Sequence, residues 1–224
     1  MATFEGVFSS IVFIGRHNPQ ILNHDFLVKH NVLPKDQPPF KELFAKEGAQ
    51  PFSEFISTPV LATIKYGPIS IVVEESHFQT VDRRFEDPPS SPIMQIAKRY
   101  FGELLRYTPL QLGGINLNGV IRFSDVKDEH AFDERLGVDR APLSGMVRTT
   151  DVRMGLFFSY PWKNGIVEVQ LPKPKDRSKL GTINFNYEFK YKDIDGFLAN
   201  LDDFGKVYAT FKSLLKSLGI EGAP

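Results

Sequence analysis

The chain has 224 residues, of which 42% are hydrophobic and 24% charged, which is enough apolar material for one large core. Its 27 Lys and Arg residues balance 27 Asp and Glu residues, so net charge provides no attraction to nucleic acid or to an anionic membrane. The absence of cysteine excludes disulfides, thiolate nucleophiles and cysteine metal sites. We find no run of about 20 apolar residues and no signal-peptide pattern, and we expect a cytoplasmic protein.

The first elements are a strand and a short helix. Residues 6–14 are rich in β-branched and aromatic side chains, which predicts a strand. Asn23 is a candidate N-cap with Asp25 in the first turn, and Pro34 stops the helix that follows. Residues 34–51 are polar and proline-rich around a short helical segment, FKELF.

Two further strands and a helix complete the first half. Residues 57–67 and 68–84 each predict a strand, and Gly67-Pro68 joins them. Ser91 is a candidate cap with Pro92 at the first helical position, which predicts a helix over 92–107.

The second half repeats this order. A strand is predicted at 113–125, and a short helix at 128–137. A hairpin is predicted around Lys163-Asn164-Gly165, because Asn-Gly is a strong hairpin signal. Another strand follows at 182–192. A long amphipathic helix begins near Asp193; its apolar residues recur at steps of three and four. They are Ile194, Phe197, Leu201, Phe204, Tyr208, Phe211, Leu215 and Leu218.

This order predicts an α+β fold in a single domain, residues 1–224, built from two pseudo-duplicated halves at about 1–110 and 111–224. Each half reads β-α-β-β-(β)-α. We expect a curved, mainly antiparallel sheet with the long helices on one face. The alternative is that any α+β chain of this length shows a similar repetition by chance.

The same order resembles the TATA-binding-protein-like fold, in which two halves build one curved antiparallel sheet. The chain also resembles a sporadically distributed bacterial family of uncharacterised proteins, and the resemblance covers most of its length. The segments that carry it are FQTVDRRFE, the Tyr100-Phe101 helix, LGGINLNGVIRFSD and NFNYEF with FLANLDDFGKVYATF. The resemblance implies a fold but no catalytic residues, and it does not imply DNA binding, because a fold does not determine function.

Three of the five histidines, His17, His24 and His30, lie within a short stretch near the N-terminus. His24 and His30 are six residues apart, which places them about 120° apart on a helix, whereas zinc-binding helices use a spacing of four. We therefore interpret the stretch as an ordinary helix start and predict no metal site. A convergence of His77 and Glu75 with this group is the alternative.

Catalytic signatures are missing from the sequence. It contains no G-x-S-x-G, P-loop or G-x-G-x-x-G motif, and we predict no cofactor and no catalytic residues. The glycines of LGGINLNG predict a bulge or tight turn at the start of a strand. Asp193 and Asp195 are interpreted as helix-start charges, and Asp202-Asp203 as a solvated helix face. The basic segment KPKDRSK is interpreted as a solvated loop, with phosphate contact as the alternative.

The alternation in two strands indicates a polar sheet face. Ile115, Leu117, Ile183 and Phe185 share the apolar face with their neighbours of the same parity, and such alternation is typical of a sheet with one solvated side. The candidate binding residues on the other face are Asn116, Asn118, Arg122, Asn184, Asn186, Glu188 and Lys190. These side chains can present hydrogen-bond donors and acceptors to a partner; a merely solvated face is the alternative.

We therefore expect a non-enzymatic binding or assembly protein that uses its open sheet face or a sheet edge, with a protein partner or self-association. One alternative is an enzyme or small-ligand receptor with a pocket between sheet and helices, in which His77, Glu75 and Arg122 could converge. The second alternative is nucleic-acid binding through the sheet. Net neutrality and a single tryptophan for base stacking argue against it.

Overall fold

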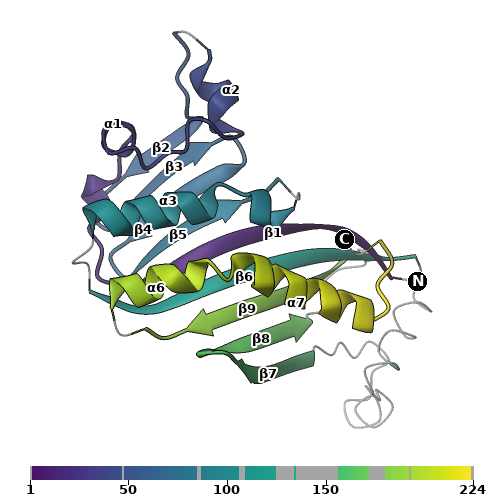
Figure 1. The fold of residues 1–224 in the computed structure, drawn as a ribbon. Helices are drawn as coiled ribbons and strands as arrows, with labels where there is room; N and C mark the ends of the chain where they lie inside the picture. The colour runs from purple at the N-terminus through teal and green to yellow at the C-terminus, as the bar shows by residue number, and fades with distance from the viewer. Residues whose placement is uncertain are drawn as a thin grey trace, which may run out of the picture.

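The protein folds around one antiparallel sheet of nine strands, ordered β2-β3-β4-β5-β1-β6-β9-β8-β7 (Figure 1). This computed structural model describes residues 2–46, 48–84, 87–105, 109–124, 134, 156–171, 180–191 and 193–222. The strands are β1 (Ala2–Gly15), β2 (Glu54–Ser57), β3 (Leu61–Tyr66), β4 (Ile69–Glu74), β5 (His77–Asp82), β6 (Leu110–Phe123), β7 (Leu156–Trp162), β8 (Gly165–Leu171) and β9 (Leu180–Phe189).

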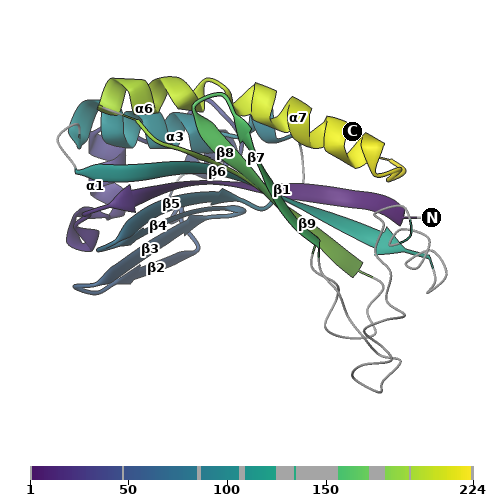
Figure 2. The same ribbon diagram turned by 90° about the horizontal axis from the view of Figure 1, so that it is seen from below.

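The helical elements are short, apart from the C-terminal helix α7. They are η1 (Pro19–Ile21), α1 (His24–Lys29), α2 (Phe40–Phe44), η2 (Pro88–Ser90), α3 (Ile93–Arg99), the π-helical turn η3 (Tyr100–Leu104), α6 (Ile194–Leu201) and α7 (Phe204–Ser217). Figure 2 shows that α3, α6 and α7 lie on one side of the sheet, as the sequence predicts. Within the described residues, no helix is long and apolar enough to cross a membrane.

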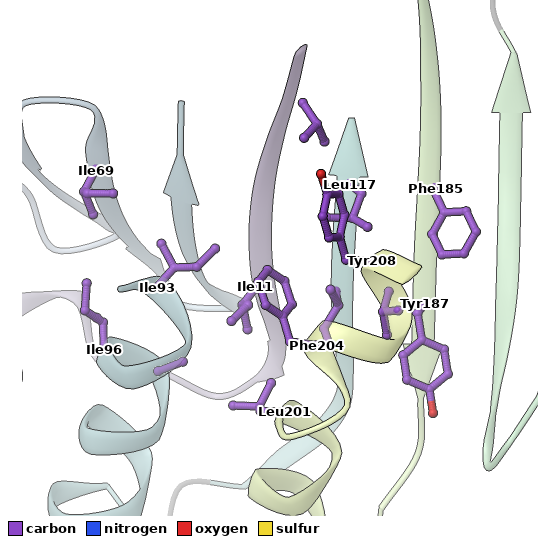
Figure 3. Close-up of a cluster of buried hydrophobic side chains, with 14 of the residues drawn as sticks. Ile11, Ile69, Ile93, Ile96, Leu117, Phe185, Tyr187, Leu201, Phe204 and Tyr208 are labelled. Carbon is purple, nitrogen blue, oxygen red and sulfur yellow. The ribbon is translucent and has the colours of Figure 1, made fainter. Parts of the chain in front are cut away.

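The core lies between the sheet and these helices. In Figure 3, Ile11, Leu117 and Phe185 of the strands lie beside Leu201, Phe204 and Tyr208 of α6 and α7. Phe123, Phe185 and Phe189, which the alternation places on the apolar face, are 6%, 1% and 0% exposed. Burial of these three rings confirms the prediction.

Phe13 of β1 joins the helices of the two halves through an aromatic cluster. Its ring centroid lies 4.4 Å from that of Phe101 and 4.0 Å from that of Phe197 on α6. Gly113 lies opposite both Phe13 and Phe189. A Cβ at Gly113 would lie 2.5 Å from the Phe197 ring and 2.6 Å from the Phe189 ring, so this glycine makes room for packed rings. The predicted irregularity lies just before this glycine, at the register shift that pairs Ile14 with Leu112 and Gly15 with Leu110.

Several local predictions are confirmed. Asn23 caps α1, because its Oδ1 accepts a hydrogen bond from the Phe26 N–H at 2.8 Å. Asp193 caps α6 in the same way, with the Gly196 N–H at 2.8 Å. The hairpin pairs Trp162 with Gly165 across the Lys163-Asn164 turn. The predicted helix at 128–137 lies outside the described residues, apart from Glu134.

Other boundaries differ from the sequence prediction. The strand predicted at 68–84 is two strands, β4 and β5, which turn at Glu75-Ser76 and bring Val73 opposite Phe78. β2 was not predicted; it pairs with β3 at the outer edge of the sheet. The predicted helix at 92–107 consists of α3 and η3, and Pro92 rather than Ser91 occupies the N-cap position.

The long C-terminal helix is also divided, into α6 and α7, at Asp202-Asp203. These two residues are not simply solvated. Asp202 forms an ion pair with Lys98 of α3, and Asp203 forms one with Lys163 of the hairpin turn at 2.5 Å. The break keeps Leu201 and Phe204 on the buried side, so the apolar stripe continues although the helix does not.

Candidate binding surface

The sheet face opposite α3, α6 and α7, which we call the open face, carries the predicted binding residues. Strand register places Ser10, Asn116, Asn186 and Glu168 opposite one another on β1, β6, β9 and β8. We call these four residues the central polar row. No helix covers the open face within the residues that the structure describes (Figure 2).

Four of the predicted residues form a compact cluster. Asn116 is opposite Asn186, and Asn118 is opposite Asn184, two positions further along the same pair of strands. All four side chains are half-buried. The Asn116 Nδ2 donates to the Ser10 Oγ at 3.3 Å, which orients one amide of the cluster and leaves its carbonyl oxygen as an acceptor.

The other three predicted residues lie around this cluster. Glu188 is half-buried and lies opposite Gly114, one step from the central polar row. Arg122 lies toward the far end of β6, where its Nε donates to the Glu5 Oε1 at 2.7 Å. Lys190 follows the last residue of β9 and is exposed. The seven residues therefore form a core of asparagines with charged groups at its margin.

The sequence interpretation missed Ser10, Glu168 and Gln170. Glu168 and Gln170 extend the polar surface onto β8, whereas Ser10 of β1 is only 3% exposed and contributes by holding the Asn116 amide. Gln170 lies opposite Asn184. The alternation of β8, in which Val167 and Val169 are buried between polar neighbours, was a signal for Glu168 and Gln170. No local signal pairs Ser10 with Asn116, because the two residues are 106 positions apart.

Apolar side chains are also exposed on this face. Ile166 is 47% exposed and lies opposite Glu188, while Ile14 is 36% exposed at the end of β1. Ile56 of β2 is 45% exposed; its register neighbours place it in the same row as Gln79 and Glu188. The open face is therefore a mixed surface of amides, carboxylates and branched aliphatic groups.

The charges on the open face are mostly acidic around the asparagines. Glu168 and Glu188 have no ion-pair partner among the described residues. Lys65, Arg122 and Lys190 are the basic side chains on or near the face. Two of them are paired with a carboxylate, Lys65 with Glu54 at 2.6 Å and Arg122 with Glu5 at 2.7 Å. Free carboxylates disfavour contact with a phosphate backbone.

The histidines near the N-terminus have separate environments. The Nδ1 of His24 lies 2.9 Å from the Tyr66 hydroxyl, and its ring stacks on Phe44. Burial lowers the pKa of His24, while His30 packs against the Phe26 ring. The described residues contain no group of three or more potential metal ligands. That His24 and His30 do not bind metal together stays a prediction.

The alternative catalytic group does not converge. His77 is opposite Ile14 and lies 3.5 Å from the Glu74 carboxylate, measured from its Nδ1. Arg122 is opposite Thr3, at the other end of the long strand β1. Glu75 lies in the turn before His77 and accepts a hydrogen bond from the His17 N–H through its backbone carbonyl.

A polar hollow of about 490 Å³ lies elsewhere, between the end of α1 and α3. Its lining includes Asn31, Lys35, Asp36 and Arg99. The Arg99 Nη1 donates to the Asn31 carbonyl at 3.1 Å, so part of the lining is occupied with holding α3 against the turn after α1. None of the predicted site residues lines it.

His17 provides a prediction about pH. Burial lowers its pKa from 6.5 to about 4, and the nearby His77 adds to this effect. The Phe13 carbonyl opposes the shift in part but makes no hydrogen bond of normal geometry with either ring nitrogen. The unfolded chain therefore binds a proton between pH 6.5 and 4 that the native protein excludes, so stability falls as pH falls through this window. We expect a loss of about 1–3 kcal/mol.

Urea unfolding at several pH values from 4 to 8 measures this loss. His17→Leu should reduce the slope of the profile below pH 6.5, and the part that comes from the lowered pKa of His24 should remain. A constant difference between wild type and His17→Leu over the whole range would show that His17 does not titrate in this way.

Comparison of the sequence with models of known protein families and with curated proteins finds no match.

Proposed function

We propose that this chain is a non-enzymatic binding protein that docks a protein partner on its open face. The observation that carries the proposal is the central polar row, Ser10, Asn116, Asn186 and Glu168, in the middle of a face that no described helix covers. The half-buried asparagines are held by a rigid pair of long strands, which favours a preorganised contact surface.

The composition of the face supports a protein partner. The asparagine amides offer both donors and acceptors, and the exposed Ile14, Ile56 and Ile166 offer apolar contact area. Protein interfaces combine apolar contacts with hydrogen bonds in this way. Nucleic acid is less well supported, because Glu168 and Glu188 place negative charge beside the asparagines. Of the basic side chains near the face, Lys65 and Arg122 are already ion-paired and only Lys190 lies at the margin without a carboxylate partner among the described residues.

We also propose that the two halves, at about 1–110 and 111–224, are a structural duplication of the TATA-binding-protein-like kind. In each half the first strand lies beside the last, β1 beside β5 and β6 beside β9, and the two first strands pair with each other at the centre of the sheet. Each half ends in helices on the same side of the sheet (Figure 2). β2 has no counterpart among the described strands of the second half.

The absence of cysteine and the balanced charge are compatible with the cytoplasmic location that we propose.

The test uses substitutions on the open face. Asn116→Arg, Asn186→Arg and Arg122→Glu should each leave the protein folded, with a change in stability of no more than about 1 kcal/mol, and should reduce partner binding. Bait proteins carrying these changes are compared with wild type in extracts of the source cells, and recovered proteins are quantified. Ser213→Arg, at an exposed position on α7, is the matched control.

The proposal expects that the same protein is recovered with wild type and Ser213→Arg and is lost with the open-face variants. If the open-face variants unfold, the face is a second core layer and is not a docking surface. If they fold and retain every partner that wild type binds, the binding site lies in the loops or on the helices.

A further inference from the structure

The outer edge of β7 has the properties of an association site. Within the described part of the chain no strand pairs with this edge, since β7 ends the sheet. Its sequence LFFSYPW is strongly aromatic and contains no charged residue. Phe157 is 61% exposed, the largest exposed fraction among the large hydrophobic residues. Natural sheets normally protect an edge with charged side chains, proline or a cover, and of these β7 has only Pro161 among the described residues.

Pro161 shows which way the backbone of β7 points. It lies within the strand, opposite Ile166 of β8. Because proline has no N–H, it is tolerated in a strand where the missing donor would face away from the neighbouring strand. Ser159 and Phe157 have the same parity, so their N–H and C=O groups also point outward and are available to another strand.

The other edge of the sheet differs. β2 has four residues, and its Glu54 forms an ion pair with Lys65. In a symmetric antiparallel pair each strand meets a copy of itself, so a charged residue near the axis is repelled by its own copy. The uncharged β7 carries no such penalty, which favours a second copy of this chain as its partner.

We propose that β7 pairs antiparallel with β7 of a second copy, with Ser159 on the two-fold axis, so that one sheet continues through both copies. In this register every residue of β7 lies opposite a residue of β7 in the second copy. The Ser159 N–H donates to the Ser159 carbonyl of the second copy, and the Ser159 carbonyl accepts the reciprocal bond from the N–H of the second copy. The Phe157 N–H donates to the Pro161 carbonyl of the second copy, so the residue without a donor serves as acceptor.

The pairing also accounts for the side chains of β7. Phe157 packs across the axis against Pro161 of the second copy on the open-face side, beside the exposed Ile166. On the other side, Phe158 lies opposite Tyr160 of the second copy, and cross-strand aromatic pairs stabilise sheets. This inference does not depend on the open-face proposal, because it uses the sheet edge and a different partner.

The first test is a cross-link in a protein that has no cysteine of its own. Residues on the axis of a hydrogen-bonded antiparallel pair have Cα atoms about 5.5 Å apart, within the range of about 4.4–6.8 Å that a disulfide spans. Ser159→Cys should therefore form a covalent dimer on mild oxidation or with a short bis-maleimide. Ser57→Cys, exposed on β2, is the matched control and should remain uncross-linked at the same concentration.

The second test is the oligomeric state in solution, measured by sedimentation velocity over micromolar to sub-millimolar concentrations. Wild type should be a dimer. Ser159→Pro removes an outward-facing N–H that β8 does not use, and Phe157→Lys places a charge near the axis; each should weaken dimerisation at least about tenfold with an unchanged circular dichroism spectrum. Phe55→Lys, on the β2 edge, should remain dimeric.

Phe157→Lys decides the result if Ser159→Pro fails to fold. A wild-type monomer at every concentration, a dimer that Phe157→Lys leaves intact, or equal cross-linking of Ser159→Cys and Ser57→Cys would each overturn the proposal. Loss of the dimer with unchanged capture of an open-face partner would support this inference and leave the proposed function standing.

Discussion

Phe185→Ala is expected to lower the free energy of unfolding by about 3–5 kcal/mol. The Phe185 ring is 1% exposed and packs edge-to-face on Phe211 of α7, with ring centroids 5.7 Å apart. Its strand neighbours Leu117 and Val169 are fully buried. Removal of the ring leaves a cavity between the sheet and α7, and β9 cannot move to close it without breaking its pairing with β6 and β8.

Urea and thermal unfolding measure this loss, and the midpoint temperature should fall by about 6–20 °C for a chain of this size. Phe55→Ala is the matched control. Phe55 is 43% exposed on the edge strand β2, so its removal should cost about 1 kcal/mol or less. Equal effects of the two substitutions would mean that α7 does not pack on β9 as the structure has it.

Asp82→Ala is expected to destabilise the protein by a similar amount, about 3–5 kcal/mol. The Asp82 side chain is 6% exposed, and the Arg84 side chain 14%. The carboxylate accepts from the Arg84 Nη2 and from the Ser91 Oγ, both at 2.6 Å. These bonds connect the end of β5 to the segment that begins α3, so the substitution removes an acceptor shared by the buried Ser91 hydroxyl and the half-buried Arg84 guanidinium.

Two further variants separate the effect of the Asp82 charge from the effect of its burial. Asp82→Asn keeps the size of the side chain and should lose about 1–3 kcal/mol, as for a hydrogen bond to a charged group. Glu54→Ala breaks a comparably short ion pair with Lys65, but both side chains are more than a third exposed, so it should cost no more than about 1 kcal/mol. A small effect of Asp82→Ala would show that the Arg84 and Ser91 contacts are replaced by solvent.

The sequence by itself was sufficient for features that depend on near neighbours along the chain. The alternation in β6 and β9 correctly predicted which face of each strand is buried, because successive side chains of a strand point to opposite sides. The Asn23 cap, the helix start near Asp193 and the Asn164-Gly165 hairpin were predicted for the same reason: each depends on bonds within a few residues.

Tertiary structure alone decided the features that depend on distant contacts. The sequence placed Asp82 near the end of a predicted strand, and only the fold shows that Ser91 and Arg84 enclose its carboxylate. The glycines of LGGINLNG were interpreted as a bulge or tight turn at the start of a strand, but the sequence did not show that the Phe197 and Phe189 rings occupy the space beside Gly113. The break between α6 and α7 carries ion pairs to Lys98 and Lys163, which are far away in sequence.

The candidate surface shows the same division. Local alternation assigned Asn116 and Asn186 to the polar face, but their position opposite each other, with Ser10 and Glu168 beside them, follows from strand order and register. Register depends on which long-range pairings bury the most apolar surface across the whole sheet. The sequence therefore determined which side chains face away from the core, and only the folded sheet decided which of them meet.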